Sequence, residues 1–181
     1  MLIQSQGFAT QFPHLFNEVT WPWGRTRAKF MLLDRVPQHE EIANVDIVPR
    51  IGENWVMLQL SDGSWDIPGG TLEPGEGYLD AIQRELMEEA GARLISHQLI
   101  GAWWCQSLAE KPYRPHLPFP YFYRLVLTGE IEIERSPDNP IGAEKVISIA
   151  SAALEVVVDR FVAQKRYDLA ELYQLASGLR D

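Results

Sequence analysis

The chain has 181 residues, of which 46% are hydrophobic and 23% are charged, and its formal net charge is −9. These proportions are ordinary for a globular protein that buries one sizeable core. The acidic balance argues against a polynucleotide partner, because such a surface needs basic residues to neutralise phosphates. A small phosphorylated substrate is compatible with this negative net charge, since a bound divalent cation makes the local electrostatic field at the site positive.

Cys105 is the single cysteine, so an intrachain disulfide is excluded and a reducing compartment is favoured. Residues 1–20 lack the basic segment followed by an apolar run that marks a signal peptide. The sequence also lacks a run of about 18 apolar residues, which a membrane helix requires. We therefore expect a cytoplasmic protein without a membrane partner, folded as a single domain over residues 1–181.

Three parts of that domain are expected: an N-terminal extension (1–40), a core (41–150) and C-terminal helices (151–181). The extension mixes polar residues with many aromatic ones, which are too numerous to remain in water. The aromatic residues are Phe8, Phe12, Phe16, Trp21 and Trp23. We predict an arm or lid that packs on the core, with a short helix at residues 15–19.

Apolar and β-branched runs predict four strands at the start of the core, bounded by glycine-containing turns. These strands span residues 29–36, 42–51, 55–60 and 65–67. The turns lie at residues 52–54 and 61–64.

A glycine-rich loop at residues 68–70 follows, and a second turn at 73–75 leads into a helix. The helix starts near Glu76 or Gly77, runs to Ala90 and ends at Gly91, a residue suited to the left-handed conformation after a helix. Apolar residues recur along it at steps of three and four, which predicts one buried stripe. The stripe contains Leu79, Ile82, Leu86 and Ala90.

Glu85, Glu88 and Glu89 crowd onto one patch of this helix, where each like-charge pair is destabilising by a few tenths of a kcal/mol. Mg²⁺ or Mn²⁺ would remove that repulsion, because both ions prefer hard oxygen ligands. The backbone of Gly69 and Gly70 could approach a ligand that a side chain would block. The alternative is a surface helix with a solvated acidic face.

This segment resembles the Nudix box, G-x5-E-x7-R-E-U-x-E-E-x-G-U, in which U is a bulky aliphatic residue. The matching residues are Gly70, Glu76, Arg84, Glu85, Leu86, Glu88, Glu89 and Gly91. Ala92 departs from the pattern, since a larger aliphatic residue is usual there. Eight fixed positions within residues 70–92 make the motif specific, and the flanking elements extend the resemblance loosely to about residues 40–165.

After the motif, residues 94–106 predict a long strand that carries Trp103 and Trp104 near its end. Adjacent strand residues face opposite sides, so one of the two can reach a pocket, either to stack on a base or to pack in the core. Four prolines make residues 110–120 a loop. We predict that Lys111 or Arg114 in this loop contacts the distal phosphate or sugar of a substrate.

Further strands are predicted at residues 121–128, 131–134 and 146–149, with a turn at Gly129. Ser151 is the expected N-cap of a helix over residues 152–165, and a last helix spans residues 168–177. We expect these helices to cover one face of the sheet. The alternative is a homodimer contact.

The Nudix resemblance implies an α/β/α sandwich with a mixed β-sheet, and a metal-dependent hydrolase that cleaves the diphosphate bond of a nucleoside diphosphate linked to another moiety. It makes Glu85, Glu88 and Glu89 catalytic carboxylates and ligands of Mg²⁺ or Mn²⁺, together with the Gly69 carbonyl. Members of the family differ in whether the acid at the Glu85 position binds metal or orients the water.

Two further roles are carried over from the resemblance. Glu76 and Arg84 would fix the loop to the helix, and one more metal-binding acid comes from a later loop, where Glu144 is preferred to Asp138. Two other classes share this fold: a nucleotide-binding regulator without catalysis, and an isoprenyl-diphosphate isomerase, which often needs a cysteine that Cys105 would have to supply.

Overall fold

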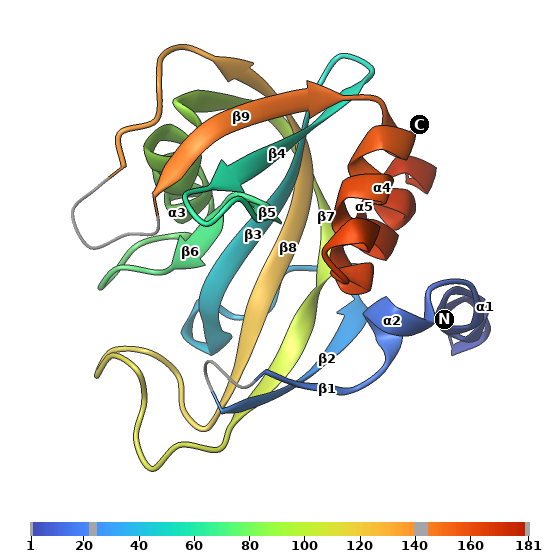
Figure 1. Ribbon diagram of the computed structural model, residues 1–181. Coiled ribbons are helices and arrows are strands. Elements are labelled where there is room, and N and C mark those ends of the chain that lie inside the picture. Colours follow the sequence, from blue (N-terminus) through green and yellow to red (C-terminus); the bar gives the residue numbers. More distant parts are fainter. Residues whose placement is uncertain (1, 22–24, 140–144, 180–181) are drawn as a thin grey trace.

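The structure, a computed structural model, describes residues 2–21, 25–139 and 145–179 (Figure 1). Its strands are β1 (Val19–Trp21), β2 (Thr26–Leu32), β3 (Ile42–Ile51), β4 (Asn54–Leu60), β5 (Trp65–Asp66), β6 (Gly69–Thr71), β7 (Ala92–Ser107), β8 (Tyr121–Ile133) and β9 (Val146–Ala152). Its α-helices are α1 (Leu2–Gln11), α2 (Pro13–Phe16), α3 (Tyr78–Glu85), α4 (Leu154–Ala163) and α5 (Tyr167–Gly178).

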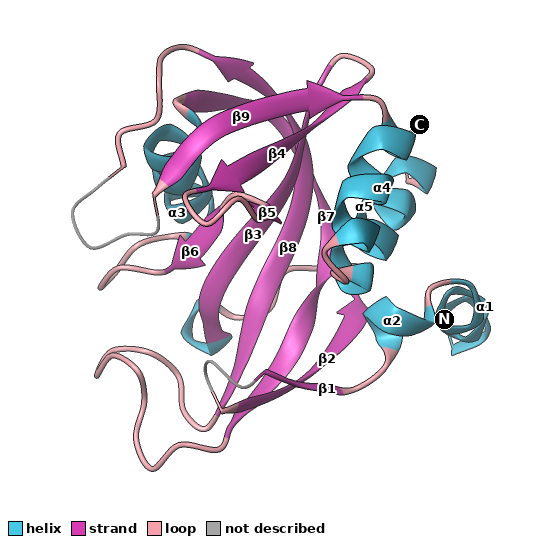
Figure 2. Ribbon diagram, viewed as in Figure 1, coloured by secondary structure: helices cyan, strands magenta, loops and turns pink. Residues whose placement is uncertain are grey.

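The described strands form one mixed sheet in the order β1-β2-β7-β8-β3-β4-β5, with β6 paired to β3 and β9 paired to β4. The β3–β8 pair is parallel, and the other pairs are antiparallel. Figure 2 shows helix α3 on one side of the sheet and helices α4 and α5 on the other. The predicted α/β sandwich is therefore confirmed.

Each face of the sheet buries its own hydrophobic cluster, because side chains alternate along the strands. Val45 and Ile47 of β3 pack with Ile82 and Leu86 under α3. Val48, on the opposite side of the same strand, belongs to the cluster beneath α4 and α5. A residue's parity along β3, β7 or β8 thus decides which helix layer it meets.

The predicted helix of the motif is present. Ile82, Leu86 and Ala90 of its apolar stripe are buried as expected, and Leu79 is partly buried. Helix α3 follows Gly77 and continues without a break into a π-helical turn (Leu86–Ala90). Gly91 ends it in the left-handed conformation, with φ of 57°. Such π-helical turns are frequent at functional sites.

The N-terminal extension packs on the core as predicted, but the predicted position of its helix is wrong. Phe12, Leu15 and Phe16 are buried in the cluster under α4 and α5, so the extension packs on the core. The helices are α1 and α2 rather than residues 15–19, because Pro13 starts α2 at a position that needs no N–H donor. Trp23 lies outside the described residues.

Other boundaries also differ from prediction. The strand predicted at residues 29–36 is β2 (Thr26–Leu32), because its pairing with β7 runs from Thr26 to Leu32. The turn predicted at Gly129 is wrong, since β8 continues through this residue. A side chain at Gly129 would collide with the Ser96 carbonyl of the bulged strand β7. Glycine therefore allows the two strands to approach each other closely. Ser151 is not a helix cap, because β9 pairs with β4 as far as Ala152 and Ala153 precedes α4.

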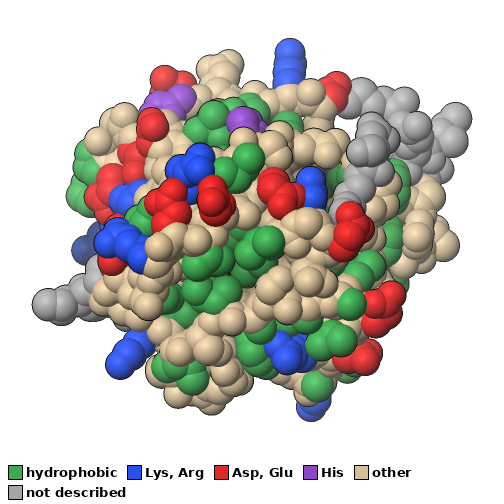
Figure 3. All heavy atoms as spheres, turned by 90° about the horizontal axis from the view of Figure 1, so that it is seen from above, with side chains coloured by type: hydrophobic (Ala, Val, Ile, Leu, Met, Phe, Trp, Pro, Cys, Tyr) green, Lys and Arg blue, Asp and Glu red, His purple; other side chains and the backbone are tan. Residues whose placement is uncertain are grey.

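Within the described part of the chain, no helix is both long and apolar enough to cross a membrane. Figure 3 shows acidic and basic side chains interspersed on the face that it displays. That distribution agrees with the expected absence of a basic stripe on this face.

Gly91 and Gly52 provide a matched test of the cap. Their φ angles are 57° and 58°, but a side chain at Gly91 would collide with the Arg135 carbonyl whereas Gly52 faces open space. Gly52→Ala should therefore lower the unfolding free energy by only about 1–2 kcal/mol, the cost of the left-handed conformation for alanine. Gly91→Ala should lower it by clearly more. Urea unfolding measures both losses, and equal losses would show that the Arg135 contact is unimportant.

Candidate active site

The glycine-rich loop lies directly against two carboxylates. A side chain at Gly70 would collide with the carboxylate of Glu85, and one at Gly69 would collide with that of Asp46. Strand β6, which contains both glycines, pairs with β3 through Val45↔Gly70 and Asp46↔Gly69. The glycines therefore allow the loop backbone to reach the acidic side chains of α3 and β3.

Arg84 joins this loop to the helix. Its guanidinium donates two hydrogen bonds to Glu76, of 2.8 and 3.0 Å, and one of 3.2 Å to the Thr71 carbonyl. It also donates to Glu85 at 2.7 Å and to Glu88 at 3.4 Å. The planar guanidinium suits this role because its donors are fixed in direction. Glu76 and Arg84 thus occupy the positions that fix loop to helix.

Burial and mutual repulsion perturb the carboxylates. Burial raises the pKa of Glu89 to about 8, with further increases from the charges of Glu85, Asp66 and Asp46, although the Gly69 N–H donates to it at 3.0 Å. Burial also raises the pKa of Glu85, an effect that Arg84 partly offsets. For Glu76 burial raises the pKa, but the hydrogen bonds from Arg84 and the Glu73 N–H, together with the Arg84 charge, outweigh burial and lower the pKa overall. The cluster holds more negative charge than its single guanidinium balances.

The donor set fits a hard divalent cation. Carboxylate oxygens beside backbone carbonyl groups are what Mg²⁺ and Mn²⁺ bind. A cation would offset both the burial and the neighbouring negative charges that raise the pKa of Glu89. Among the described residues, no three acidic, histidine or cysteine side chains already converge as a ligand set. Glu85 and Glu88 each contact Arg84 through one carboxylate oxygen.

A cavity of about 920 Å³ lies on the α4–α5 face and reaches the glycine loop. Asp46, Asp66 and Ile67 line its inner end, and Asp46 touches the position of Gly69. Trp103 and Arg124 form part of its floor. Its size is that of a pocket for a small organic ligand.

The structure separates the two tryptophans of β7. Trp103 is 4% exposed and lines the cavity, whereas Trp104 is 37% exposed and stacks on Tyr121 on the opposite side of the strand. Trp103 also makes edge-to-face contacts with Trp21 and Phe30.

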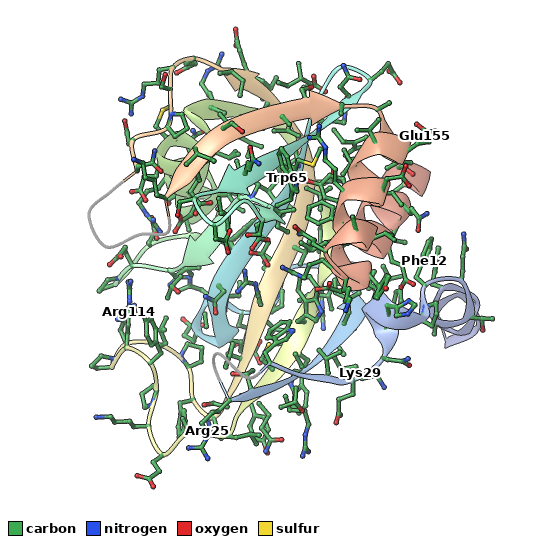
Figure 4. All side chains as sticks on the ribbon, in the orientation of Figure 1. Phe12, Arg25, Lys29, Trp65, Arg114 and Glu155 are labelled. Carbon is green, nitrogen blue, oxygen red and sulfur yellow. The ribbon has the colours of Figure 1, made fainter. Side chains whose placement is uncertain are left out.

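The proline-rich loop turns toward the segment before α3. Arg114, labelled in Figure 4, pairs with Glu73 at 2.8 Å. His116 Nε2 lies 2.8 Å from the Leu72 carbonyl oxygen. Lys111 and Arg114 do not line the large cavity. Arg114 borders the outer side of the motif loop instead, through its pair with Glu73.

Of the two later acids, Asp138 pairs with Arg135 at 2.7 Å and its backbone N–H donates to the Glu88 carbonyl at 2.8 Å. That bond brings the segment after β8 alongside the π-helical turn that follows α3. Glu144 lies outside the described residues.

Four charged residues of the cavity were missed by sequence reasoning. Asp46, 1% exposed, forms a two-pronged ion pair with Arg124, while Asp66 lies 3.8 Å from Arg166. One signal was available: Asp46 and Arg124 interrupt apolar strands, and a buried charge requires a partner. Nothing comparable marked Asp66, inside the short strand predicted at residues 65–67, or Arg166, between the two predicted C-terminal helices.

The NUDIX domain profile matches residues 41–167, more than half of the chain. The chain belongs to the NUDIX domain family. Nudix hydrolases generally use divalent metal ions, in agreement with the oxygen-rich cluster. The N-terminal extension and most of α5 lie outside the matched region.

Curated Nudix relatives are similar over shorter stretches. A Bacillus subtilis protein named "Putative 8-oxo-dGTP diphosphatase YtkD" is 33% identical over 70 residues, covering 39% of this chain and 44% of that protein. The Bos taurus m7GpppN-mRNA hydrolase NUDT17 is 39% identical over 72 residues, covering 39% and 23%. The matches thus span less than half the length of either relative.

A crystal structure of a Bacillus subtilis pyrophosphohydrolase, BsRppH, has a similar fold. Its TM-score is 0.56 at 20% sequence identity, and the match covers 75% of this chain and 77% of that one. This similarity supports the α/β architecture.

The raised pKa of Glu89 predicts a pH-dependent stability of the metal-free protein. The fold favours protonated Glu89, so its contribution to the unfolding free energy falls as pH rises from about 4.5, the ordinary value, to about 8. Glu89→Gln stays neutral and can still accept a hydrogen bond from the Gly69 N–H. Its melting temperature should therefore exceed that of the parent at pH 9 and differ little from it at pH 5. Thermal unfolding in EDTA measures this, and an equal difference at both pH values would contradict it.

Proposed function

We propose that the protein is a metal-dependent pyrophosphohydrolase that cleaves the diphosphate bond of a small nucleoside diphosphate linked to another moiety. The observation that carries this proposal is the acidic cluster beside the cavity: Glu85 and Glu89 pack against the glycine loop, and Glu88 joins them through Arg84. A diphosphate at the loop would have its leaving group or nucleoside in that cavity.

Each residue has a role that its position supports. Glu88 and Glu89 would hold Mg²⁺ or Mn²⁺ with the Gly69 carbonyl, and Glu85 would bind metal or orient the attacking water. A bound divalent ion neutralises charge on the phosphate oxygens and lowers the pKa of a water ligand. Arg84 keeps the loop and the helix in register, so the acids meet the substrate in a fixed arrangement.

On the outer side of the loop, Arg114 and Lys111 would contact the distal phosphate or sugar. Arg114 already reaches Glu73 of the segment before α3. An additional metal ligand from Asp138 or Glu144 is part of the same proposal, supported by the bond between Asp138 and the Glu88 carbonyl.

Other classes fit less well. An isomerase would need Cys105 as a protonating partner, but this thiol is completely buried and its pKa is raised to about 12 by that burial. A regulator without catalysis would not need every motif acid, yet all are retained. The names of both curated relatives concern guanine-containing substrates, which makes guanine nucleotides the first to assay. The net charge of −9 favours free nucleotides over RNA.

Turnover of nucleoside diphosphate derivatives with Mg²⁺ or Mn²⁺, followed by phosphatase-coupled phosphate release, tests the proposal. Glu88→Gln and Glu89→Gln should each remain folded and lose at least ~100-fold in turnover, in line with the loss of a metal-site residue. Glu155→Gln, an exposed glutamate of α4 that Figure 4 labels, is the matched control and should keep parental activity. Full activity in EDTA, or in both motif variants, would sink the metal-hydrolase assignment.

A further inference from the structure

The outer wall of the cavity comes from a part of the chain that lies outside the family match. His14, Asn17, Val19 and Trp21 line one side of it, and all four precede residue 41, where the NUDIX match begins. The turn between α4 and α5 supplies the other side through Arg166 and its neighbours. The cavity is therefore shaped in part by residues outside the region that matches the NUDIX domain profile.

Glu171 fastens the N-terminal wall to helix α5. One carboxylate oxygen lies 2.6 Å from His14 Nδ1, and the other accepts from the Leu15 N–H at 2.7 Å. Glu171 is 13% exposed, whereas the His14 side chain is 56% exposed, so the bond to the Leu15 N–H is the better shielded of the two. The wall is thus held in place before any ligand arrives.

The cavity combines aromatic surface with a carboxylate and a guanidinium that lie opposite each other. Trp21 and Trp103 contact each other edge to face, with ring centroids 5.7 Å apart. Asp66 Oδ1 accepts from the Ile67 N–H at 2.8 Å, and Arg166 holds Asp168 through Nε and Nη2 at 3.0 and 3.1 Å. These bonds fix both side chains and leave Asp66 Oδ2 and Arg166 Nη1 facing each other.

Those two atoms lie 3.8 Å apart, too far for a hydrogen bond between them. The side chains of Asp66 and Arg166 are 39% and 40% exposed, so a ligand can reach them. The neighbouring pair differs: Arg124 is bound by Asp46, which is 1% exposed. Asp66 and Arg166 thus form the polar recognition element of the cavity.

We propose that this cavity binds the base of the substrate and that Asp66 and Arg166 select guanine. The guanine edge places two N–H donors beside a carbonyl oxygen, which match a carboxylate and a guanidinium respectively. Adenine offers one amino group beside an unprotonated ring nitrogen, whose lone pair faces the carboxylate unfavourably. The indole rings supply the apolar surface for the base. This inference rests on the proposed hydrolysis at the adjoining glutamates.

Calorimetric binding of GMP and AMP to the whole chain tests base selection without any turnover. The parent should bind GMP about 10-fold more tightly than AMP, the scale of one well-matched paired contact. Asp66→Asn keeps an acceptor for the Ile67 N–H and should abolish this preference. Asp159→Asn, at an exposed position of α4, is the matched control and should retain it. Arg166→Gln is a second variant that should also weaken GMP binding.

Equal binding of GMP and AMP, no binding of either, or an unchanged preference in Asp66→Asn and Arg166→Gln would overturn base selection. The two proposals fail separately. A GMP preference lost in Asp66→Asn, in a protein that hydrolyses no nucleotide with Mg²⁺ or Mn²⁺, supports the base site and removes the hydrolase assignment. Turnover of nucleotides without any preference between GMP and AMP in binding supports the hydrolase assignment and removes the base site.

Discussion

The structure depends most on the contact between one guanidinium and the carboxylates around it. Arg84 binds Glu76 with two hydrogen bonds, reaches Glu85 and Glu88, and also holds the Thr71 carbonyl. Without this cation the partly buried acids would repel each other at short range, and removing one partner of a buried ion pair typically destabilises by about 3–5 kcal/mol. The same arrangement leaves a surplus of negative charge beside the glycine loop, which is where a divalent cation would be most stabilised.

Strand β3 places this cluster between the α3 layer and the α4–α5 layer of the fold. Residues of β3 point alternately to the α3 layer and to the α4–α5 layer, so Val45 and Asp46 face opposite sides. The glycine loop crosses the sheet edge at this strand, and the Ile47 N–H donates to the Pro68 carbonyl at 2.9 Å. A substrate at the loop would therefore meet acids from the α3 layer at its diphosphate and the cavity of the other layer at its nucleoside.

Local features of this chain were predictable from sequence, and distant contacts were not. The helix, its buried stripe and its end at Gly91 follow from spacing within about twenty residues, and β3 was predicted at its observed bounds because its flanking turn is explicit. Asp46 and Arg124 lie 78 residues apart, and no local pattern pairs them. The N-terminal wall was predicted to pack on the core, but its place beside Arg166 depends on Glu171 of the last helix. Gly129 was misassigned because glycine serves close strand approach as well as turns.

Direct observation of metal binding tests the central claim, that the glutamates of α3 and its π-helical turn form a divalent cation site. Titration of Mn²⁺ into the whole protein, followed by the electron paramagnetic resonance signal of free Mn²⁺, reads binding without substrate. The account predicts saturable uptake by the parent and by Glu155→Gln, and at least ~10-fold weaker uptake by Glu89→Gln, as expected for the loss of a residue at the metal. Equal uptake by Glu89→Gln and the parent would contradict it, because the cation would then bind elsewhere.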